Sequence, residues 1–339
     1  MSNKMKAIIM TEKGGPEVLR LSEIDRPEIN NTHDVLIRVR AAGVNPADWQ
    51  IRKAGTPDYV KKSQGLLILG LDGAGVVEAV GDAVTLVSVG DEVYYTDGGF
   101  AQYQGSYAEY KVVDEQYLAL KPKSLGFLEA AALPVVVVTT FAAVFDQADV
   151  KSGDFVLVHG GAGGLGHIGI QLALSRGARV ATTVSTDKKA GLVKALGAEC
   201  VIRYRDEDVK SVLSAWSGKE GADVVFDFVG HENFAASFDL VAPYGTLVNT
   251  VESDWPKGSN VLAEFKNMSI KFVNMGWPQV MRNHAGRLHQ TQMLKDAAQM
   301  VDAGKLKPIL DRVYPLTQAG EAQWVLEAGE TVGRIVLEI

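Results

Sequence analysis

The feature that most constrains this chain is a run of glycines between an apolar segment and a helical pattern. Residues 155–158 are apolar and have the length of a buried strand, and a helical pattern begins near Ile168. Between them, Gly161-Ala-Gly163-Gly-Leu-Gly166 has the spacing G-x-G-x-x-G. Glycine permits a tight turn and lets the backbone approach a pyrophosphate, while the start of the following helix offers free N–H donors. This context favours a dinucleotide site over the alternative, a glycine-rich turn that binds nothing.

The length and composition of the chain limit what it can be. With 339 residues it is too long for one ordinary core, so two domains are expected. A net charge of −7 disfavours nucleic acid or an anionic membrane as the main partner. Cys200 is the single cysteine, which excludes an intrachain disulfide and a multi-cysteine zinc site. Because we find no signal peptide and no apolar run long enough to span a membrane, we expect a cytoplasmic protein.

Two regions of the chain have different patterns. Up to about residue 124, short β-rich runs alternate with turn signals, which is typical of a small, mostly antiparallel barrel. These runs are residues 5–10, 18–24, 35–40, 73–80 and 91–95. From about residue 125, an apolar helical segment (128–145) is followed by strands that alternate with helical patterns, which predicts a doubly wound parallel sheet. Its strands are expected at residues 155–158, 179–184, 200–202, 223–229, 246–251 and 270–275. A helix near 285–301 and a last strand at 333–337 follow, and we expect that strand to return to the first domain.

The segment after the second strand of this sheet bears on cofactor choice. In NAD sites of this kind an acid about 20 residues past the glycines binds the ribose 2′-OH. Here the strand leaves through Ser185-Thr-Asp187-Lys-Lys189, with no carboxylate at its end. Hydroxyls and lysines suit the 2′-phosphate of NADPH, which we therefore favour over NADH. Two alternatives stay open: an ordinary helix cap with surface lysines, and a ribose contact from Asp187.

Several stretches together resemble one family. They are Ala41-Ala-Gly-Val-Asn-Pro-Ala-Asp48, Gly70-Leu-Asp-Gly-Ala-Gly-Val-Val77, Ala131-Ala-Leu-Pro134 with Thr139-Thr140, His159–Gly166, Gly221-Ala-Asp-Val-Val-Phe-Asp-Phe-Val-Gly230 and Gly333-Arg-Ile-Val-Leu337. This combination, from about residue 5 to 337, resembles the medium-chain dehydrogenase/reductases, in the zinc-free quinone oxidoreductase branch typified by zeta-crystallin. The resemblance implies an α/β protein of two domains. Residues 1–124 and 280–339 would form a GroES-like, mostly antiparallel β-barrel for the substrate, and residues 125–279 a Rossmann domain for the cofactor.

The resemblance also implies an activity and an assembly. We expect hydride transfer from NADPH to a quinone or an α,β-unsaturated carbonyl, and a homodimer formed through the sheet edge near residues 270–275. One alternative is a reductase of enoyl thioesters from another branch of the same superfamily. The other is a protein that binds NADPH without turnover. Residues 251–290 are left without a single role, and the alternatives are the substrate entrance, the dimer edge, or both.

The zinc ligands of related alcohol dehydrogenases are missing at the matching positions. Asn45 replaces the ligand cysteine, and Gly70-Leu71-Asp72 replaces Gly-His-Glu. The third ligand would fall within residues 135–138, which are all valine. His284 and His289 are five residues apart, which does not match a helical metal pair. We expect no metal.

The resemblance assigns residues to the substrate site and to the cofactor site. Asn45 and Gln50 are the candidates for positioning the substrate or the nicotinamide, although Asn45 before Pro46 is also a turn signal. Asp48 is expected to pair with a base such as Arg334, and Tyr59 is a weak substitute for the tyrosines of some relatives, so we assign no general acid. His159 is expected to pack beside the loop, and a C-terminal arginine contact is expected to be absent near Gly329-Glu330. The predicted cofactor contacts are Asn45, Thr139, Gly163, Gly164, Leu165, Gly166, Ser185, Lys189, Tyr204, Val229, Thr250 and Met275. For Val229 and Met275, ordinary sheet packing is an equal alternative.

Overall fold

The computed structural model of the chain describes residues 3–55, 66–100, 104–251, 253–255 and 257–339. It divides into two compact units. Unit 1 contains Met1–Val135, Gly276–Gly304 and Pro308–Ile339, and unit 2 contains Val136–Met275 and Lys305–Lys307. The change of unit at Val135 lies later in the chain than the predicted boundary at residue 124. None of the described helices combines the length and the apolar character needed to cross a membrane.

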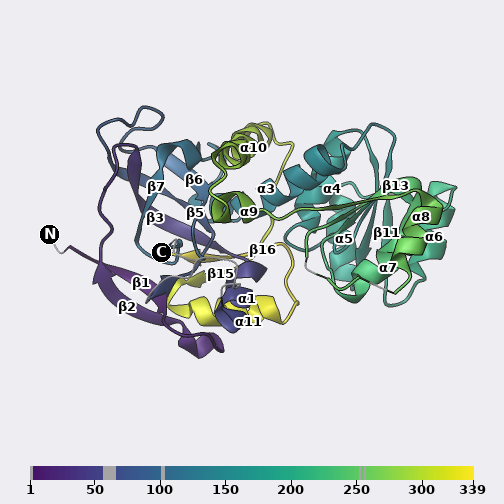
Figure 1. The fold of residues 1–339 in the computed structure, drawn as a ribbon, viewed down its shortest axis with the longest axis horizontal. Helices are drawn as coiled ribbons and strands as arrows, with labels where there is room; N and C mark the ends of the chain where they lie inside the picture. The colour runs from purple at the N-terminus through teal and green to yellow at the C-terminus, as the bar shows by residue number, and fades with distance from the viewer. Residues whose placement is uncertain (1–2, 56–65, 101–103, 252, 256) are drawn as a thin grey trace. The chain divides into compact units, whose positions relative to one another are not determined.

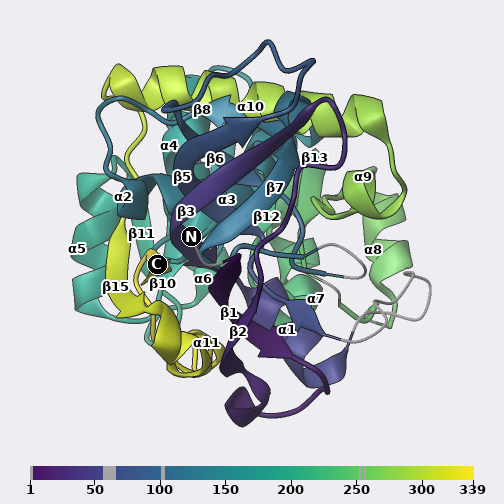
Figure 2. The same ribbon diagram turned by 90° about the vertical axis from the view of Figure 1, so that its left-hand side faces the viewer.

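Unit 1 is built around an antiparallel sheet with the order β15-β16-β3-β5-β6-β8, in which β7 also pairs with β3 (Figure 1). Its strands are β3 (Asp34–Val44), β5 (Asp72–Val80), β6 (Glu92–Thr96), β7 (Tyr110–Asp114), β8 (Ala119–Leu120), β15 (Leu310–Pro315) and β16 (Arg334–Glu338). Figure 2 shows β3, β5, β6 and β7 side by side. The closing strand β16 pairs with β3, so its predicted return to the first part of the chain is confirmed. Among the described strands of this sheet, β15 and β16 are the only neighbours that pair in parallel.

A second, three-stranded sheet and several helices complete the description of unit 1. The small sheet has the order β2-β1-β4, with β1 (Lys4–Met10), β2 (Arg20–Asp25) and β4 (Leu67–Ile68). The helices are α1 (Pro46–Ala54), α2 (Phe127–Ala131), α9 (Trp277–Val280), α10 (His284–Asp302) and α11 (Ala319–Glu327). One apolar core cluster joins both ends of the chain, because Ile8 and Val44 pack with Ala322 and Leu337. The strand predicted at 18–24 begins only at Arg20, since Pro16–Val18 forms a 3-10 turn.

Unit 2 is a six-stranded parallel sheet of order β11-β10-β9-β12-β13-β14. Its strands are β9 (Phe155–Val158), β10 (Arg179–Val184), β11 (Cys200–Arg203), β12 (Ala222–Asp227), β13 (Val241–Asn249) and β14 (Ser269–Phe272). The helices are α3 (Pro134–Phe141, which begins in unit 1), α4 (Gly166–Ser175), α5 (Asp187–Ala195), α6 (Val209–Ser217), α7 (Glu232–Leu240) and α8 (Ser259–Lys266). The predicted doubly wound sheet is confirmed, with β9 at its centre and the strand order reversing beside it.

Two predicted elements differ in the structure. The helical segment expected at 128–145 is divided into α2, α3 and a π-helical turn, Ala142–Gln147. Ala132 and Leu133 separate α2 from α3, because the residue before a proline, here Leu133, disfavours the helical conformation. The edge strand β14 ends at Phe272, so Met275 lies beyond it.

Candidate functional site

The turn between β9 and α4 requires glycine at two of its positions. Gly160 has a φ of +67°, and its carbonyl accepts a hydrogen bond from Gly163 N at 2.8 Å. A Cβ atom on Gly166 would lie 2.2 Å from that carbonyl oxygen, and one on Gly161 would lie 1.9 Å from Thr182 Oγ1. These distances are far below van der Waals contact. Glycine at these two positions is therefore required by the packing of the loop on itself and on β10.

The same turn presents unused backbone donors. Within the part of the chain that the structure describes, the amides of Gly164, Leu165 and Gly166 have no acceptor, and the side chain of Leu165 cannot cap the helix. They stand at the start of the ten-residue helix α4, where the helix dipole is positive. A phosphate group is the ligand that such a turn favours. The predicted loop residues Gly163, Gly164, Leu165 and Gly166 thus fit the pyrophosphate of a dinucleotide.

The carboxyl ends of β10 and β11 bring together the residues expected at the adenosine end. Val184 pairs with Arg203, so Ser185 and Tyr204 follow at the same sheet edge. Helix α5 starts just beyond, with Thr186 Oγ1 accepting from Lys189 N at 3.3 Å. Ser185 and Lys189 are half-buried, and 49% of Tyr204 is exposed. All three predicted residues are therefore open to a ligand at this edge.

Arg203 is a basic residue at this edge that the sequence interpretation missed. Its Nη1 donates to Asp187 Oδ1 at 2.7 Å. This ion pair neutralises Asp187, the acid considered as an alternative ribose ligand. The signal in the sequence was the position of Arg203 directly before Tyr204, a residue already assigned to the adenosine.

The other predicted cofactor residues lie along the same unit. Val229 follows β12 and is 47% exposed, whereas Thr250 follows β13 and its buried hydroxyl has no partner within the described residues. Thr139 lies in α3 and is 5% exposed, and Met275 is half-buried beyond the edge strand. Ligands of open α/β sheets bind at the carboxyl ends of the strands, where Val229 and Thr250 stand.

Unit 1 contains a buried polar cluster around Asn45. Asn45 precedes α1 and is only 1% exposed. Its Nδ2 donates to Asp72 Oδ2 at 2.9 Å, and its Oδ1 accepts from Arg334 Nη2 at 2.8 Å. Both atoms of the amide, the group predicted to face the substrate or the nicotinamide, are therefore engaged inside this cluster. Gln50 lies on α1 with an exposed side chain, and Tyr59 is outside the described residues.

Arg334 forms its ion pair with Asp72, so the predicted pair of Arg334 with Asp48 is wrong. Arg334 Nη2 lies 2.9 Å from Asp72 Oδ2, and Arg334 Nε donates to the carbonyl of Ala132 at 2.9 Å. Asp72 Oδ1 accepts from Val135 N at 2.7 Å. Asp48 instead accepts from Asn45 N at 2.8 Å and from the Tyr107 hydroxyl at 3.0 Å. The pairing follows from the position of β16 beside β3, whose other neighbour β5 carries Asp72, and the spacing along the sequence does not show this.

The two carboxyl groups of the cluster are hard to ionise. Burial raises the pKa of Asp48 from 3.8 to about 7, against the hydrogen bond from Asn45 N, which lowers it. Burial also raises the pKa of Asp72 to about 6, opposed by the charge of Arg334. Asp48 Oδ1 has no hydrogen-bond partner among the described residues. Of the two carboxyl groups, Asp48 thus keeps its proton to the higher pH.

We expect Asp48 to make stability depend on pH. Between about pH 4 and about pH 7 the folded protein keeps the proton that the unfolded chain has released, so the free energy of unfolding falls as the pH rises through this window. Asp48→Asn cannot titrate and should flatten the slope, leaving the smaller contribution of Asp72. Urea unfolding measured from about pH 5 to about pH 8 tests this. A slope in the variant equal to that of the unsubstituted protein would contradict the assignment.

The donor set at the positions of the dehydrogenase zinc does not fit the metal. Asn45 is bound to Asp72 and Arg334, and Leu71, which is 3% exposed, offers no ligand atom. Within the described residues, no group of three or more His, Cys, Asp or Glu side chains could hold a metal ion. Zinc prefers thiolate, imidazole and carboxylate ligands in a tetrahedral set.

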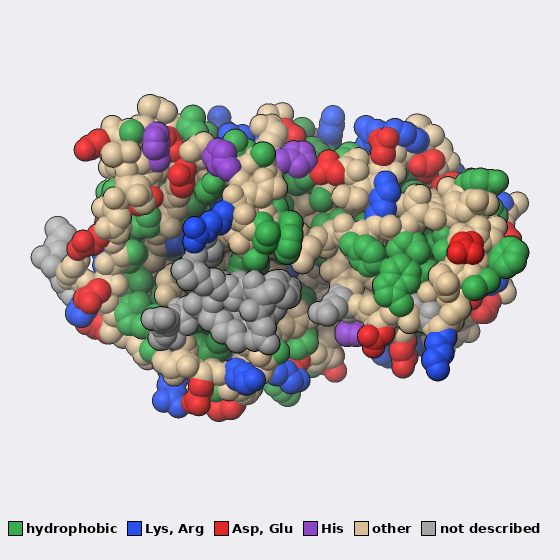
Figure 3. Space-filling model, in the orientation of Figure 1, with side chains coloured by type: hydrophobic (Ala, Val, Ile, Leu, Met, Phe, Trp, Pro, Cys, Tyr) green, Lys and Arg blue, Asp and Glu red, His purple; other side chains and the backbone are tan. Residues whose placement is uncertain are grey.

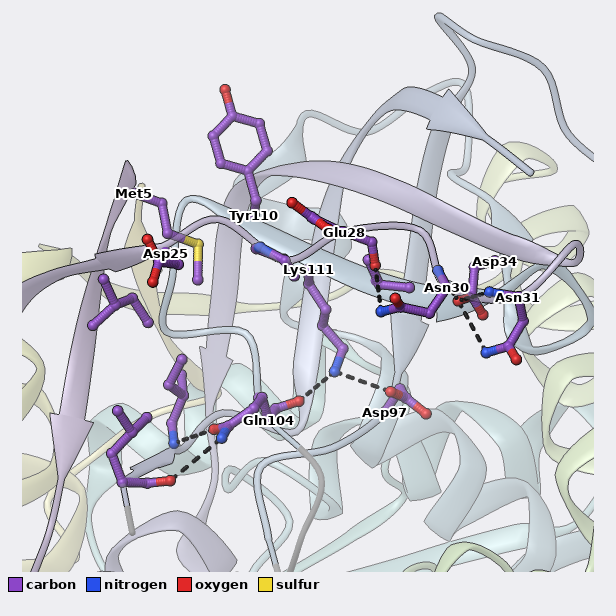
Figure 4. Close-up of a pocket in the computed structure, with 16 residues that line it drawn as sticks. Met5, Asp25, Glu28, Asn30, Asn31, Asp34, Asp97, Gln104, Tyr110 and Lys111 are labelled. Atoms are coloured by element: carbon purple, nitrogen blue, oxygen red, sulfur yellow. Dashed lines mark hydrogen bonds and ion pairs between the residues drawn. The ribbon is translucent and has the colours of Figure 1, made fainter. Parts of the chain in front are cut away.

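A pocket of about 470 Å³ opens in unit 1 (Figure 4). Asp25, Glu28 and Asp34 lie among its lining residues. Figure 4 shows Lys111 between Gln104 and Asp97, and its Nζ lies 2.9 Å from Asp97 Oδ2. None of the predicted site residues lines this pocket. We assign it no part in the binding of a dinucleotide phosphate, because its one lysine is already paired.

Comparisons with known proteins agree with this geometry. Residues 31–123 match the family model for the alcohol dehydrogenase GroES-like domain, and residues 196–337 match that for zinc-binding dehydrogenase. The chain is 31% identical to quinone oxidoreductase of Sus scrofa, over 98% of this chain and 97% of the relative. It is 34% identical to 2-methylene-furan-3-one reductase of Solanum lycopersicum, over 99% of this chain and 79% of the relative. The solved structure of Pseudomonas syringae quinone oxidoreductase has a TM-score of 0.85 at 33% identity and covers 99% of this chain and 100% of that chain.

The parallel sheet with its glycine loop and these matches define an oxidoreductase that binds a nicotinamide cofactor. The chain belongs to the medium-chain dehydrogenase/reductase superfamily, in its quinone oxidoreductase branch. The resemblance inferred from the sequence is confirmed.

Proposed function

We propose that this protein transfers hydride from NADPH to a quinone or an α,β-unsaturated carbonyl without a metal. The observation that carries the proposal is the β9–α4 turn, with its glycines fixed by close contacts and its three unused amides. The relatives named as quinone oxidoreductase and 2-methylene-furan-3-one reductase support an electron-poor acceptor of this class. A reductase of enoyl thioesters and an NADPH-binding protein without turnover are the competing functions.

The chain's own residues would bind and orient the cofactor. The amides of Gly164, Leu165 and Gly166 would bind the pyrophosphate, and Ser185, Lys189 and Tyr204 the adenosine end. Asn45 would act as a positioning residue rather than contact the acceptor directly. Its amide nitrogen already donates to Asp72, and its amide oxygen already accepts from Arg334. NADPH, when bound, supplies the hydride. The missing zinc ligands support a site that polarises the acceptor by hydrogen bonds.

We propose NADPH over NADH because the strand β10 is followed by Ser185 and Thr186, and the next residue, Asp187, has its carboxylate paired. Asp187 is paired with Arg203, so it repels a 2′-phosphate less than an isolated acid would. Ser185→Asp combined with Lys189→Ala should weaken NADPH binding by about 1–3 kcal/mol while NADH changes little. Cofactor fluorescence titrations measure both constants. Lys194→Ala, at the other end of α5, is the control and should change neither. Equal losses for the two cofactors would remove the 2′-phosphate assignment.

We also propose that the functional form is a homodimer. Large apolar side chains are exposed on unit 2, and Figure 3 shows apolar side chains gathered on its surface. They include Phe265 (82% exposed), Trp255 (55%) and Phe272 (53%), the last of which ends the edge strand β14. Among the described strands β14 pairs only with β13, and an edge strand beside exposed aromatic rings favours pairing with a second copy.

The acceptor class is tested by turnover. Purified protein is mixed with NADPH and a panel of quinones, 2-alkenals and an enoyl-CoA, and cofactor oxidation is followed by absorbance. Oxidation with quinones or alkenals is expected. Turnover confined to the enoyl-CoA would favour the thioester reductase, and tight NADPH binding without oxidation of any acceptor would exclude both enzymatic functions.

A further inference from the structure

Four buried polar residues form a row across the carboxyl edge of the parallel sheet. They are Thr183, His159, Asp227 and Asn249, from or next to β10, β9, β12 and β13, and each is at most 3% exposed. Thr182 and Phe226 both pair with Val158, and Asp227 pairs with Asn249. Residues at one level of a parallel sheet direct their side chains to the same face, about 4.8 Å apart. The row is thus continuous over four neighbouring strands.

Hydrogen bonds connect this row to three loops that follow the strands. Thr183 Oγ1 accepts from Gly160 N at 3.1 Å and lies 3.2 Å from His159 Nδ1, at the entry of the glycine loop. Asp227 Oδ1 accepts from Val229 N and Gly230 N at 2.9 Å each. Asn249 Oδ1 accepts from Val251 N at 2.6 Å. One side of the row therefore holds the backbone where the cofactor is proposed to lie.

The inner atoms of the row have no partner within the described residues. These atoms are His159 Nε2, Asp227 Oδ2 and Asn249 Nδ2. Burial lowers the pKa of His159 to about 4, so its ring is neutral, although the nearby Asp227 charge acts against this. When the Thr183 hydroxyl donates to Nδ1, Nε2 carries the ring proton. Two donors and one acceptor at neighbouring positions of the row then lack partners, a set that a single water satisfies by accepting twice and donating once.

We propose that His159, Asp227 and Asn249 bind one water molecule and that this hydrated row positions the cofactor loops. Asp227 is its central residue, because Oδ1 holds the Val229–Gly230 turn and Oδ2 is the one acceptor available to the proposed water. The inference rests on the proposed binding of NADPH. It assigns a positioning role to three residues with no proposed contact to the cofactor.

The variant Asp227→Asn tests the row. Its amide oxygen can still accept from Val229 N and Gly230 N. Its amide nitrogen, however, replaces Asp227 Oδ2, so all three atoms proposed to bind the water would be donors. The dissociation constant of NADPH should rise roughly tenfold or more. Adenosine 2′,5′-bisphosphate, which uses only the edge at β10 and β11, should bind within about twofold of the unsubstituted protein. A general loss of folding would weaken both ligands alike.

Two further variants make the test specific. Asp227→Asn with Asn249→Asp restores an acceptor in the row and should recover most of the NADPH affinity. Asp223→Asn is the matched control, since Asp223 accepts from Phe155 N at 2.9 Å at the opposite end of the same strand region and should not affect NADPH. A crystal structure at high resolution should show the water within hydrogen-bond distance of all three atoms.

Each outcome decides the inference. Unchanged NADPH binding in Asp227→Asn, equal losses for the two ligands, no recovery in the double variant, or no water at the site would overturn it. If the unsubstituted protein itself fails to bind NADPH, the proposed function fails instead. The first titration therefore separates the two failures.

Discussion

Arg334→Ala should lower the free energy of unfolding by about 3–5 kcal/mol, because it leaves the carboxylate of Asp72 buried without its countercharge. Asp72 is 0% and Arg334 3% exposed, and their charged groups lie 2.9 Å apart. The variant also frees the carbonyl of Ala132 and the amide oxygen of Asn45. Urea unfolding at about pH 8, where Asp72 is ionised, measures the loss.

An exposed ion pair of the same unit is the control for Arg334. Lys4 and Asp25 lie 2.7 Å apart, with side chains that are 47% and 78% exposed. Lys4→Ala should produce no measurable change, because solvent screens such a pair. Arg334→Met combined with Asp72→Leu should cost less than Arg334→Ala alone, since it buries no unpaired charge. A loss below about 1 kcal/mol for Arg334→Ala would contradict the central place of this pair in unit 1.

Gly166→Ala should weaken NADPH binding about 100-fold or more, because the added Cβ atom would lie 2.2 Å from the carbonyl oxygen of Gly160. The loop must then open, which displaces the amides proposed to bind the pyrophosphate. Helix propensity alone predicts the opposite sign, since alanine favours a helix more than glycine does. Fluorescence titration with NADPH measures the effect, and thermal unfolding shows whether the variant remains folded.

Gly191→Ala is the matched control for the glycine loop. Gly191 lies inside α5, and a Cβ atom there would meet nothing within 4 Å. This variant should be more stable by about 0.5–1 kcal/mol and should bind NADPH unchanged. If Gly166→Ala and Gly191→Ala bind NADPH equally well, the close contact between Gly166 and Gly160 has no role in binding.

Features that are encoded within a few residues could be predicted from the sequence. The apolar run at β9, the glycine spacing and the helical pattern of α4 are contiguous, so the turn between them was recognised with its neighbours. The residues proposed to bind the 2′-phosphate could also be proposed from the sequence, because they follow β10 directly and lie close together in the chain. The closing strand β16 was assigned to the first domain by its pattern and its place in the chain, and it pairs with β3.

Contacts between distant residues could not be predicted in the same way. Asp72 and Arg334 are 262 residues apart, and their pairing follows from the position of β16 beside β3 rather than from any local pattern. Asp48 has the same charge as Asp72 and lies in the motif Asn45-Pro-Ala-Asp48, so the sequence favours it, wrongly, as the partner of Arg334. The row of Thr183, His159, Asp227 and Asn249 has the same origin, because its members lie at or next to the carboxyl ends of four different strands and the register alone aligns them.

The most direct test of the account follows the hydride itself. The protein is first treated with a chelator until the zinc concentration is below the protein concentration. It is then incubated with NADPH deuterated at C4 and an α,β-unsaturated ketone. The account predicts undiminished turnover and deuterium bound to carbon in the reduced product, at the position β to the carbonyl. Turnover that disappears with the metal, or a reduced product without deuterium from either face of the cofactor, would contradict direct, metal-free hydride transfer.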